Sequence, residues 1–202
     1  MLRNSPTTRR LLSANLAIYL LTLFLPGPLY HFFALHNYGS DKFSPIQLVT
    51  YQFLHSTAPL HIIFNMMILV VFGAVVESRM GTPKMLRYYL ACGVVAGLLH
   101  NLTISSEMLV LSAATGNDLT LVGASGSVWG ILALFALMRP NEPLYMFFLP
   151  VAIRAKWVVA AFFAIELLSA FIVRDNVSHF AHVGGAMTGL AIFIYERKKG
   201  NI

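Results

Sequence analysis

The chain alternates long apolar stretches with short polar connections, a pattern typical of a membrane protein. Most of the apolar stretches approach the roughly 20 residues that a helix needs to cross a bilayer. The fourth and the sixth are short and rich in Gly and Ala, so we expect them to begin or end inside the protein. The pattern predicts an all-α bundle of six transmembrane helices in a single domain, residues 1–202, with spans at about 11–33, 60–78, 85–104, 124–138, 157–173 and 179–195.

Two segments of the amino-terminal quarter need separate interpretation. The first apolar stretch follows Arg9-Arg10 and resembles a secretory signal, but no convincing small-residue cleavage site follows it and five more apolar stretches do. We therefore expect an uncleaved first span. The connection 34–59 is long, aromatic and lightly charged. Because aromatic side chains concentrate where the bilayer meets water, we expect this segment to lie in the membrane interface.

Composition supports a membrane location. Of the 202 residues, 57% are hydrophobic and 11% are charged, and the mean hydropathy is +0.71. A soluble domain carries roughly 25% charged residues, so this chain lacks the polar surface of a soluble protein. Cys92 is the only cysteine, which excludes an intrachain disulfide and a cysteine-based metal cluster. We interpret it as a small apolar residue within a helix.

The net charge of +6 reflects how basic residues are shared between the two sides of the membrane. Lys and Arg concentrate in the cytoplasmic loops of membrane proteins. With six spans, only Lys42 and Arg174 fall on the outer side. We expect a multi-pass protein of the inner (cytoplasmic) membrane with both termini in the cytoplasm, and no nucleic-acid partner. The residues on the amino-terminal side are Arg3, Arg9, Arg10, Arg79, Lys84, Arg87, Arg139, Arg154, Lys156, Arg197, Lys198 and Lys199.

Ser125 is the first candidate for chemistry. It opens an apolar helix within the run Gly123-Ala124-Ser125-Gly126. Backbone N–H groups at a helix start lack intrahelical partners and can stabilise an oxyanion, and glycines let a substrate backbone approach closely. An ordinary N-cap serine between packing glycines would give the same local pattern.

Small residues predict how the fourth and the sixth helices pack. Gly126, Gly130 and Ala133 form one smooth face, and Ala181, Gly185 and Gly189 form another. Such faces let membrane helices approach closely. We expect this packing to bring His182 to Ser125, with Trp129, one turn beyond the serine, near the imidazole ring.

A neutral imidazole beside a serine hydroxyl is the minimum arrangement for nucleophilic attack. Asp175 lies seven residues before His182, roughly 10 Å along a helix, which is too far for a direct contact. Glu166 is an intramembrane carboxylate, but nothing in the sequence directs it to His182. We therefore expect a Ser125/His182 dyad and no third member.

His61 and Asn65 are four residues apart and share one face of the second helix. Two donors at this spacing suit an oxyanion site, although a polar pair that joins two helices would look the same. We expect His31, His36 and His100 to be structural, and His55 and His179 to brace the site by hydrogen bonds. The histidines lack a carboxylate at ligand spacing, so we expect no metal and no cofactor.

Three motifs occur in order: His61-Ile-Ile-Phe-Asn65, Gly123-Ala-Ser125-Gly126 and Ala181-His182-Val-Gly-Gly185. Together they resemble the rhomboid intramembrane serine proteases, over most of the chain from about Phe53 to Gly189. One motif alone would be a weak signal, whereas all three on the expected spans are specific.

The resemblance implies a rhomboid-type bundle whose short fourth helix starts mid-membrane beneath a water-filled cavity. It implies Ser125 as nucleophile, His182 as base, and an oxyanion hole from His61, Asn65 and the Ser125 amide. Segment 34–59 would be the family's half-embedded first loop, and the fifth helix its proposed lateral gate. Substrates would be single-span membrane proteins, cut near the outer face after a small residue. The supporting residues would be Gly123, Gly126, Trp129 and Gly185.

The chain departs from the family pattern at two places. Many members have Tyr where this chain has Trp129, and many have a Trp-Arg pair in the first loop where this chain has Ile46-Gln47-Leu48. We expect the Trp ring to replace the Tyr ring on the histidine. How the first loop is held without the Trp-Arg pair is left open.

Peptide hydrolysis needs water, so the helices must enclose a polar pocket. We expect Ser125, His182, His61 and Asn65 to line it, with Ser127 and Ser178 as further candidates. A catalytically inactive rhomboid-like protein of membrane-protein quality control is the main alternative. A six-span transporter is a second, but the chain shows no duplicated half. A bare structural bundle leaves the order of the motifs unexplained.

Overall fold

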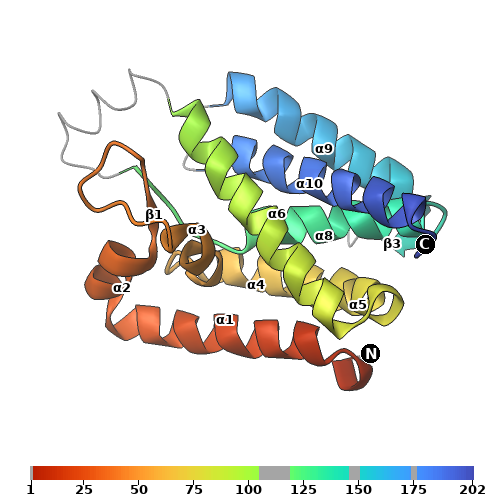
Figure 1. Ribbon diagram of the computed structural model, residues 1–202, viewed down its shortest axis with the longest axis horizontal. Helices are drawn as coiled ribbons and strands as arrows, with labels where there is room; N and C mark the ends of the chain where they lie inside the picture. Colours follow the sequence, from red (N-terminus) through yellow and green to blue (C-terminus); the bar gives the residue numbers. More distant parts are fainter. Residues whose placement is uncertain (1, 105–118, 146–150, 174–176) are drawn as a thin grey trace.

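The computed structural model describes residues 2–104, 119–145, 151–173 and 177–202, and most of them are helical (Figure 1). A short 3-10 turn, η1 (Leu2–Asn4), precedes α1. The long helices lie roughly side by side, with α8 in the middle, α1 on one edge and α9 on the opposite edge (Figure 1). The helices are α1 (Pro6–Phe24), α2 (Pro26–Phe33), α3 (Gln47–Thr50), α4 (Pro59–Ile68), α5 (Ala74–Met80), α6 (Thr82–Thr103), α8 (Ser125–Met138), α9 (Ala155–Ile172) and α10 (His179–Lys198).

The first apolar stretch forms two helices instead of the single span expected over 11–33. Helix α1 ends at Phe24, Leu25 has non-helical dihedrals (φ −132°, ψ 51°), and α2 restarts at Pro26. Proline suits the first position of a helix and cannot continue one, because it has no N–H to donate. The Pro26-Gly27-Pro28 run therefore explains the break.

The other expected spans each coincide with a helix. The second is unbroken from Pro59 to Met80, because the π-helical turn η3 (Leu69–Gly73) joins α4 to α5. Within the described residues, Pro59–Met80 and Ala155–Ile172 are the two helices long and apolar enough to cross a membrane. The crossing of the other four remains a prediction. Helix α8 has 14 residues, about 21 Å of length, which is less than the ~30 Å of a bilayer core.

Helices α8 and α10 touch backbone to backbone, as their small-residue faces predict. A Cβ atom added to Gly185 would lie 1.9 Å from the Gly126 carbonyl oxygen, and one added to Gly189 would lie 2.2 Å from that of Gly130. Ten of the 14 residues of α8 are buried. Next to this contact α8 also meets α6, where a Cβ atom on Gly130 would lie 2.3 Å from the Cys92 sulfur. Cys92 is thus the buried packing residue that its surroundings predicted.

Gln47 holds the segment between α2 and α4, which also contains the 3-10 turn η2 (Tyr51–Phe53). The Gln47 amide oxygen accepts from the backbone N–H groups of His36 and Ser44, at 3.3 and 3.1 Å. Its amide nitrogen donates to the carbonyls of Phe32 and Lys42, at 3.3 and 2.9 Å. Four hydrogen bonds made by one buried side chain therefore fix this loop.

The same loop also positions the approach to α8. Strand β1 (Leu35–His36) pairs antiparallel with β2 (Thr120–Leu121), so that Leu35 is opposite Leu121. The Gly123 N–H donates to the Tyr51 carbonyl at 3.0 Å. The residues that precede Ser125 are thus anchored to the loop: Thr120 and Leu121 to His36 and Leu35, and Gly123 to Tyr51.

Two buried carboxylates join helices at the opposite end of the bundle. Glu77 accepts from the backbone N–H groups of Thr7 and Thr8, at 2.7 and 2.8 Å, and so caps the start of α1. Glu196 on α10 pairs with Lys84 on α6 at 2.6 Å. A hairpin of β3 (Pro143–Tyr145) and β4 (Ala152–Arg154) connects α8 with α9.

Candidate active site

Ser125 is the first residue of α8, and the backbone before it has a conformation that only glycine adopts readily. Gly123 has φ +129°, a region that disfavours residues with a Cβ atom. A Cβ atom there would lie 2.9 Å from His61 Nε2 and 3.7 Å from Ser125 Oγ. Glycine at this position therefore keeps open the space between the serine and His61.

His182 lies against Ser125. Its Nε2 is 2.9 Å from Ser125 Oγ, which is hydrogen-bonding distance. The Trp129 ring stacks on the imidazole, with centroids 5.8 Å apart and planes 29° from parallel. The close contact of α8 and α10 through Gly126 and Gly185 sets this geometry, because the serine and the histidine sit on the touching helices.

The hydrogen bonds of His61 define which of its nitrogens carries a proton. The Ser56 backbone N–H donates to His61 Nδ1 at 3.3 Å, and the Ser56 hydroxyl lies 2.9 Å from the same atom. A nitrogen that accepts from a backbone N–H is unprotonated, so Nε2 carries the hydrogen of the neutral ring. That N–H is beside Gly123, where it can donate to an oxygen bound near Ser125.

Asn65 and His55 complete this side of the site. Asn65 is buried, and one of its amide hydrogens goes to the His61 carbonyl at 2.8 Å. His55 is buried and lies edge to face with His61, with centroids 5.2 Å apart. Burial, with a smaller effect of His61, lowers the pKa of His55 to about 3. The His55 ring is therefore neutral and adds no charge beside His61.

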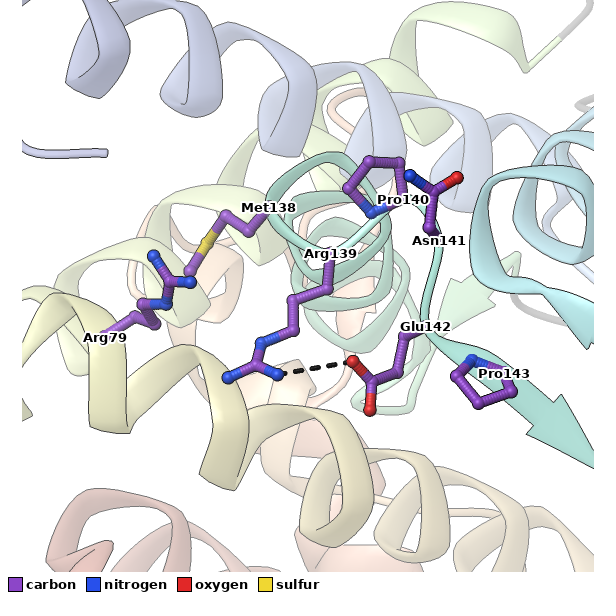
Figure 2. Close-up of a pocket in the computed structure, with 7 residues that line it drawn as sticks. All are labelled: Arg79, Met138, Arg139, Pro140, Asn141, Glu142 and Pro143. Carbon is purple, nitrogen blue, oxygen red and sulfur yellow. Dashed lines mark hydrogen bonds and ion pairs between the residues drawn. The ribbon is translucent and has the colours of Figure 1, made fainter.

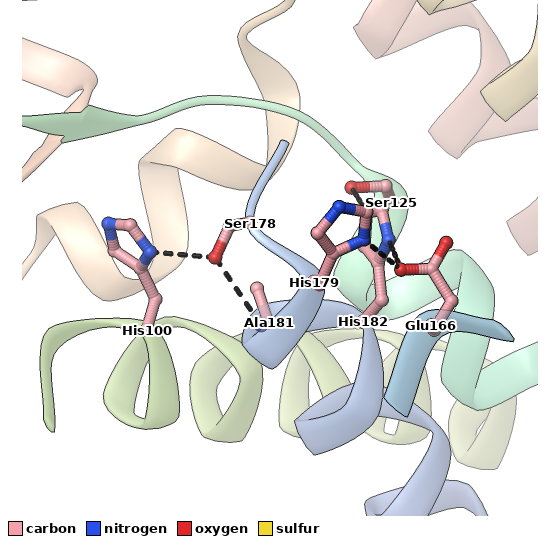
Figure 3. A network of polar contacts seen from close by, with 7 residues as sticks. All are labelled: His100, Ser125, Glu166, Ser178, His179, Ala181 and His182. Carbon is pink, nitrogen blue, oxygen red and sulfur yellow. Dashed lines mark hydrogen bonds and ion pairs between the residues drawn. The ribbon is translucent and has the colours of Figure 1, made fainter. Parts of the chain in front are cut away.

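Glu166 on α9 contacts the second ring nitrogen of His182, Nδ1. The sequence did not indicate this contact. Its Oε2 is 2.9 Å from His182 Nδ1 and 2.7 Å from His179 Nδ1 (Figure 3). The contact with His179 is a hydrogen bond. The contact with His182 has the distance of an ion pair, although its geometry falls short of a regular hydrogen bond. The one available signal was the carboxylate itself, since an ionisable residue within an apolar span usually has a function.

The donor atoms of Glu166, His179 and His182 lie within 4.8 Å of one another. Two histidines and a carboxylate are a ligand set that suits zinc. The contacts among the three side chains already account for their closeness, so we do not assign them as metal ligands.

Two serines expected in the pocket have other partners. Ser127 is fully buried and donates to the Gln52 side chain at 2.9 Å. Ser178 caps α10 and lies 2.7 Å from His100 Nδ1 (Figure 3). The contact with Ser178 fits the structural role expected of His100. Ser127, which was expected to line the pocket, belongs instead to the packing of α8 and does not line the site.

A separate surface pocket lies at the far end of α8 (Figure 2). Helix α8 runs from Ser125 to Met138, so this pocket is about 20 Å from the serine. Figure 2 shows one ion pair among its lining residues, the exposed pair between Arg139 and Glu142 at 3.2 Å. Nothing in it suggests chemistry. The lining residues are Arg79, Met138, Arg139, Pro140, Asn141, Glu142 and Pro143.

Comparison with known proteins agrees with the motifs. Residues 42–199 match the family model of the rhomboid domain. The chain is 27% identical over 197 residues to "Rhomboid protease GlpG" of Yersinia pseudotuberculosis, covering 96% of this chain and 63% of that protein. It is 28% identical over 152 residues to "Presenilin-associated rhomboid-like protein A, mitochondrial" of Danio rerio, covering 75% of this chain and 37% of that protein. A third relative is "RHOMBOID-like protein 6, mitochondrial" of Arabidopsis thaliana, 26% identical over 155 residues and covering 76% of this chain and 43% of that protein.

The chain thus spans between about a third and two thirds of the length of these relatives. The matched domain contains all the residues of the candidate site, from His61 to His182. With the domain model matching more than half of the chain, the protein belongs to the rhomboid family.

Proposed function

We propose that the protein is an intramembrane serine endopeptidase, with Ser125 as nucleophile and His182 as general base. The observation that carries this proposal is the 2.9 Å contact between Ser125 Oγ and His182 Nε2 at the start of a buried helix. A serine alone is a weak nucleophile, and an adjacent base is what activates it. The family match and the name of the Yersinia relative agree with this activity.

The reaction follows from the placement of these groups. Ser125 Oγ attacks the scissile carbonyl while its proton passes to His182 Nε2, giving a tetrahedral intermediate with a negative oxygen. When the C–N bond breaks, His182 returns the proton to the leaving amine, and water then hydrolyses the acyl-enzyme. The N–H of His61 Nε2, the Ser125 amide and the Asn65 side chain are the proposed donors to the oxyanion.

The proposed substrates are single-span membrane proteins. Apolar side chains cover the outside of α9, among them Trp157, Phe162 and Phe171, which suits a surface facing lipid. The basic residues favour an inner-membrane protein with both termini in the cytoplasm. Gly123 leaves room beside Ser125, which suits a substrate whose helix has unwound before the attack.

Labelling with a fluorophosphonate serine probe tests the proposal in the detergent-solubilised protein. The wild type should label, whereas Ser125→Ala and His182→Ala should not. Ser78→Ala is the matched control, because Ser78 lies in α5 and its hydroxyl donates to the Val75 carbonyl of the same helix. Equal labelling of wild type and Ser125→Ala would place the reactive serine elsewhere. A folded wild type that neither labels nor cleaves a single-span reporter in liposomes would favour the catalytically inactive relative.

A further inference from the structure

The two ring nitrogens of His182 face opposite partners. Nε2 faces Ser125 Oγ at 2.9 Å, and Nδ1 faces Glu166 Oε2 at 2.9 Å. The three groups come from three helices, α8, α10 and α9, and meet at the N-terminal end of α8 (Figure 3). The imidazole therefore lies between a hydroxyl and a carboxylate.

A carboxylate in this position acts on the proton of the ring. To accept the serine proton, Nε2 must be unprotonated, so the single proton of the neutral ring has to be on Nδ1. An ionised carboxylate only accepts hydrogen bonds, so Glu166 favours the tautomer with the proton on Nδ1. Its negative charge also stabilises the imidazolium that forms when Ser125 attacks.

His179 holds the carboxylate in place. It precedes His182 by three residues and so projects from the same face of α10. Its Nδ1 is 2.7 Å from the Glu166 oxygen that also faces His182. The three side chains are mostly buried, with 17%, 13% and 12% exposure for Glu166, His179 and His182. One oxygen thus bridges two imidazoles in a partly dehydrated setting, where electrostatic interactions are stronger than in water.

We propose that Glu166 is a positioning residue for His182, and that this protein works with a Ser125–His182–Glu166 arrangement in place of a bare dyad. The inference rests on the proposed function of Ser125 and His182. It adds a third group, supplied by α9, that fixes the tautomer of the base and stabilises its charged form.

The charged and titratable groups around His182 are few among the described residues. They are Glu166 from α9, His179 from α10 and His61 from α4, while α8 contributes the neutral Ser125 and Trp129. Glu166 is the one acidic group of this set. Removing its charge should therefore weaken the stabilisation of the imidazolium that forms when Ser125 attacks, which lowers the rate of the chemical step.

The test compares Glu166→Gln with wild type by the rate of fluorophosphonate labelling at neutral pH, with the final labelled fraction recorded separately. We expect the same final fraction and a rate lower by roughly 10- to 1,000-fold. The loss should stay below the ~10⁴-fold effect of the Asp to Asn change in a buried serine protease triad, because Glu166 is partly exposed. Glu142→Gln, the same change at the exposed Arg139 ion pair, should behave as wild type.

Two further variants separate positioning from a structural role. Glu166→Asp keeps the charge at a longer distance, so its rate should lie between those of Glu166→Gln and wild type; it also carries the test if the Gln variant does not fold. His179→Gln retains an N–H donor for the carboxylate, so its labelling rate should remain close to that of wild type.

Specific results would overturn the proposal. A Glu166→Gln enzyme with the wild-type rate, or one that loses labelled fraction while the labelled molecules react at the wild-type rate, would make Glu166 a structural residue. Inactivation of the wild type by a chelator would make the three side chains a metal site instead. These outcomes all require that wild type labels and Ser125→Ala does not, so they are distinct from failure of the proposed function.

Discussion

The two sides of α10 are packed in different ways. Toward α8 the contact is backbone on backbone, with no room for a single added carbon at Gly185 or Gly189. Toward α9 the contact is made by side chains, through Glu166 and through the edge-to-face rings of Phe171 and Phe180 at 5.5 Å. Helix α9 has only two buried residues among its 18, Ala155 and Val159.

This difference separates two requirements of the proposed chemistry. The distance between nucleophile and base depends on the rigid side, since Ser125 and His182 sit on the helices that touch through glycine. The charge that acts on the base comes from the loosely packed side. Changes at the glycine contact between α8 and α10 should therefore lower both stability and activity, whereas changes on the α9 side should lower the rate alone.

Gly185→Ala should have the largest effect, because its new Cβ atom meets a carbonyl that cannot move without shifting α8. Overpacking of this kind costs about 3 kcal/mol, and a shift of about 1 Å at the dyad would lower the rate roughly 100-fold. Thermal unfolding and probe labelling in detergent measure the two effects. Gly184→Ala is the matched neighbour: its Cβ atom would meet side-chain atoms of Leu99 at 3.1 Å, so it should cost clearly less. Equal effects of the two changes would contradict the comparison.

Trp129→Ala should have an intermediate effect, confined to activity. The indole stacks on His182 but takes no part in the α8–α10 glycine contact. Loss of an aromatic pair is worth about 1 kcal/mol, so we expect a roughly fivefold to tenfold lower labelling rate. Trp129→Phe should keep most of the rate, because a flat ring remains. Unfolding of the Ala variant at a much lower temperature would instead make Trp129 a packing residue.

The sequence predicted the rigid side well and the loose side poorly, for a physical reason. Close glycine packing leaves a spacing of four residues that can be read directly, so the approach of Gly126 to Gly185 and the meeting of Ser125 with His182 were predicted. A contact such as that between Glu166 and His182 produces no periodic pattern in the sequence. It depends on how α9 is rotated and on how far α10 extends, and a dyad was accordingly expected.

The loop and the helix ends show the same limit. Gln47 was expected only as a departure from the family pattern, yet it makes four hydrogen bonds to backbone groups. Nothing in local sequence specifies such distant partners. The break at Leu25 was missed although Pro26 signalled it, because the apolar run continues on both sides.

Phe171→Ala should have the smallest effect and is the sharpest probe of the α9 side. Removing the ring deletes its contact with Phe180 near the start of α10 and loosens the position of Glu166 relative to His182. If about half of an aromatic pair's ~1 kcal/mol reaches the active site, the labelling rate should fall about twofold to threefold, with little change in unfolding temperature. Trp157→Ala, an exposed aromatic change nine residues before Glu166 on the same helix, is the control and should leave the rate unaltered.

The decisive measurement is the double variant. If Phe171 acts through Glu166, then Phe171→Ala should have no further effect on the rate in a Glu166→Gln background, because the group it positions has lost its charge. Additive losses would mean that Phe171 influences His182 by another route. A large loss of stability from Phe171→Ala alone would mean that α9 contributes to the rigid frame, and the contrast between the two sides of α10 would then not hold.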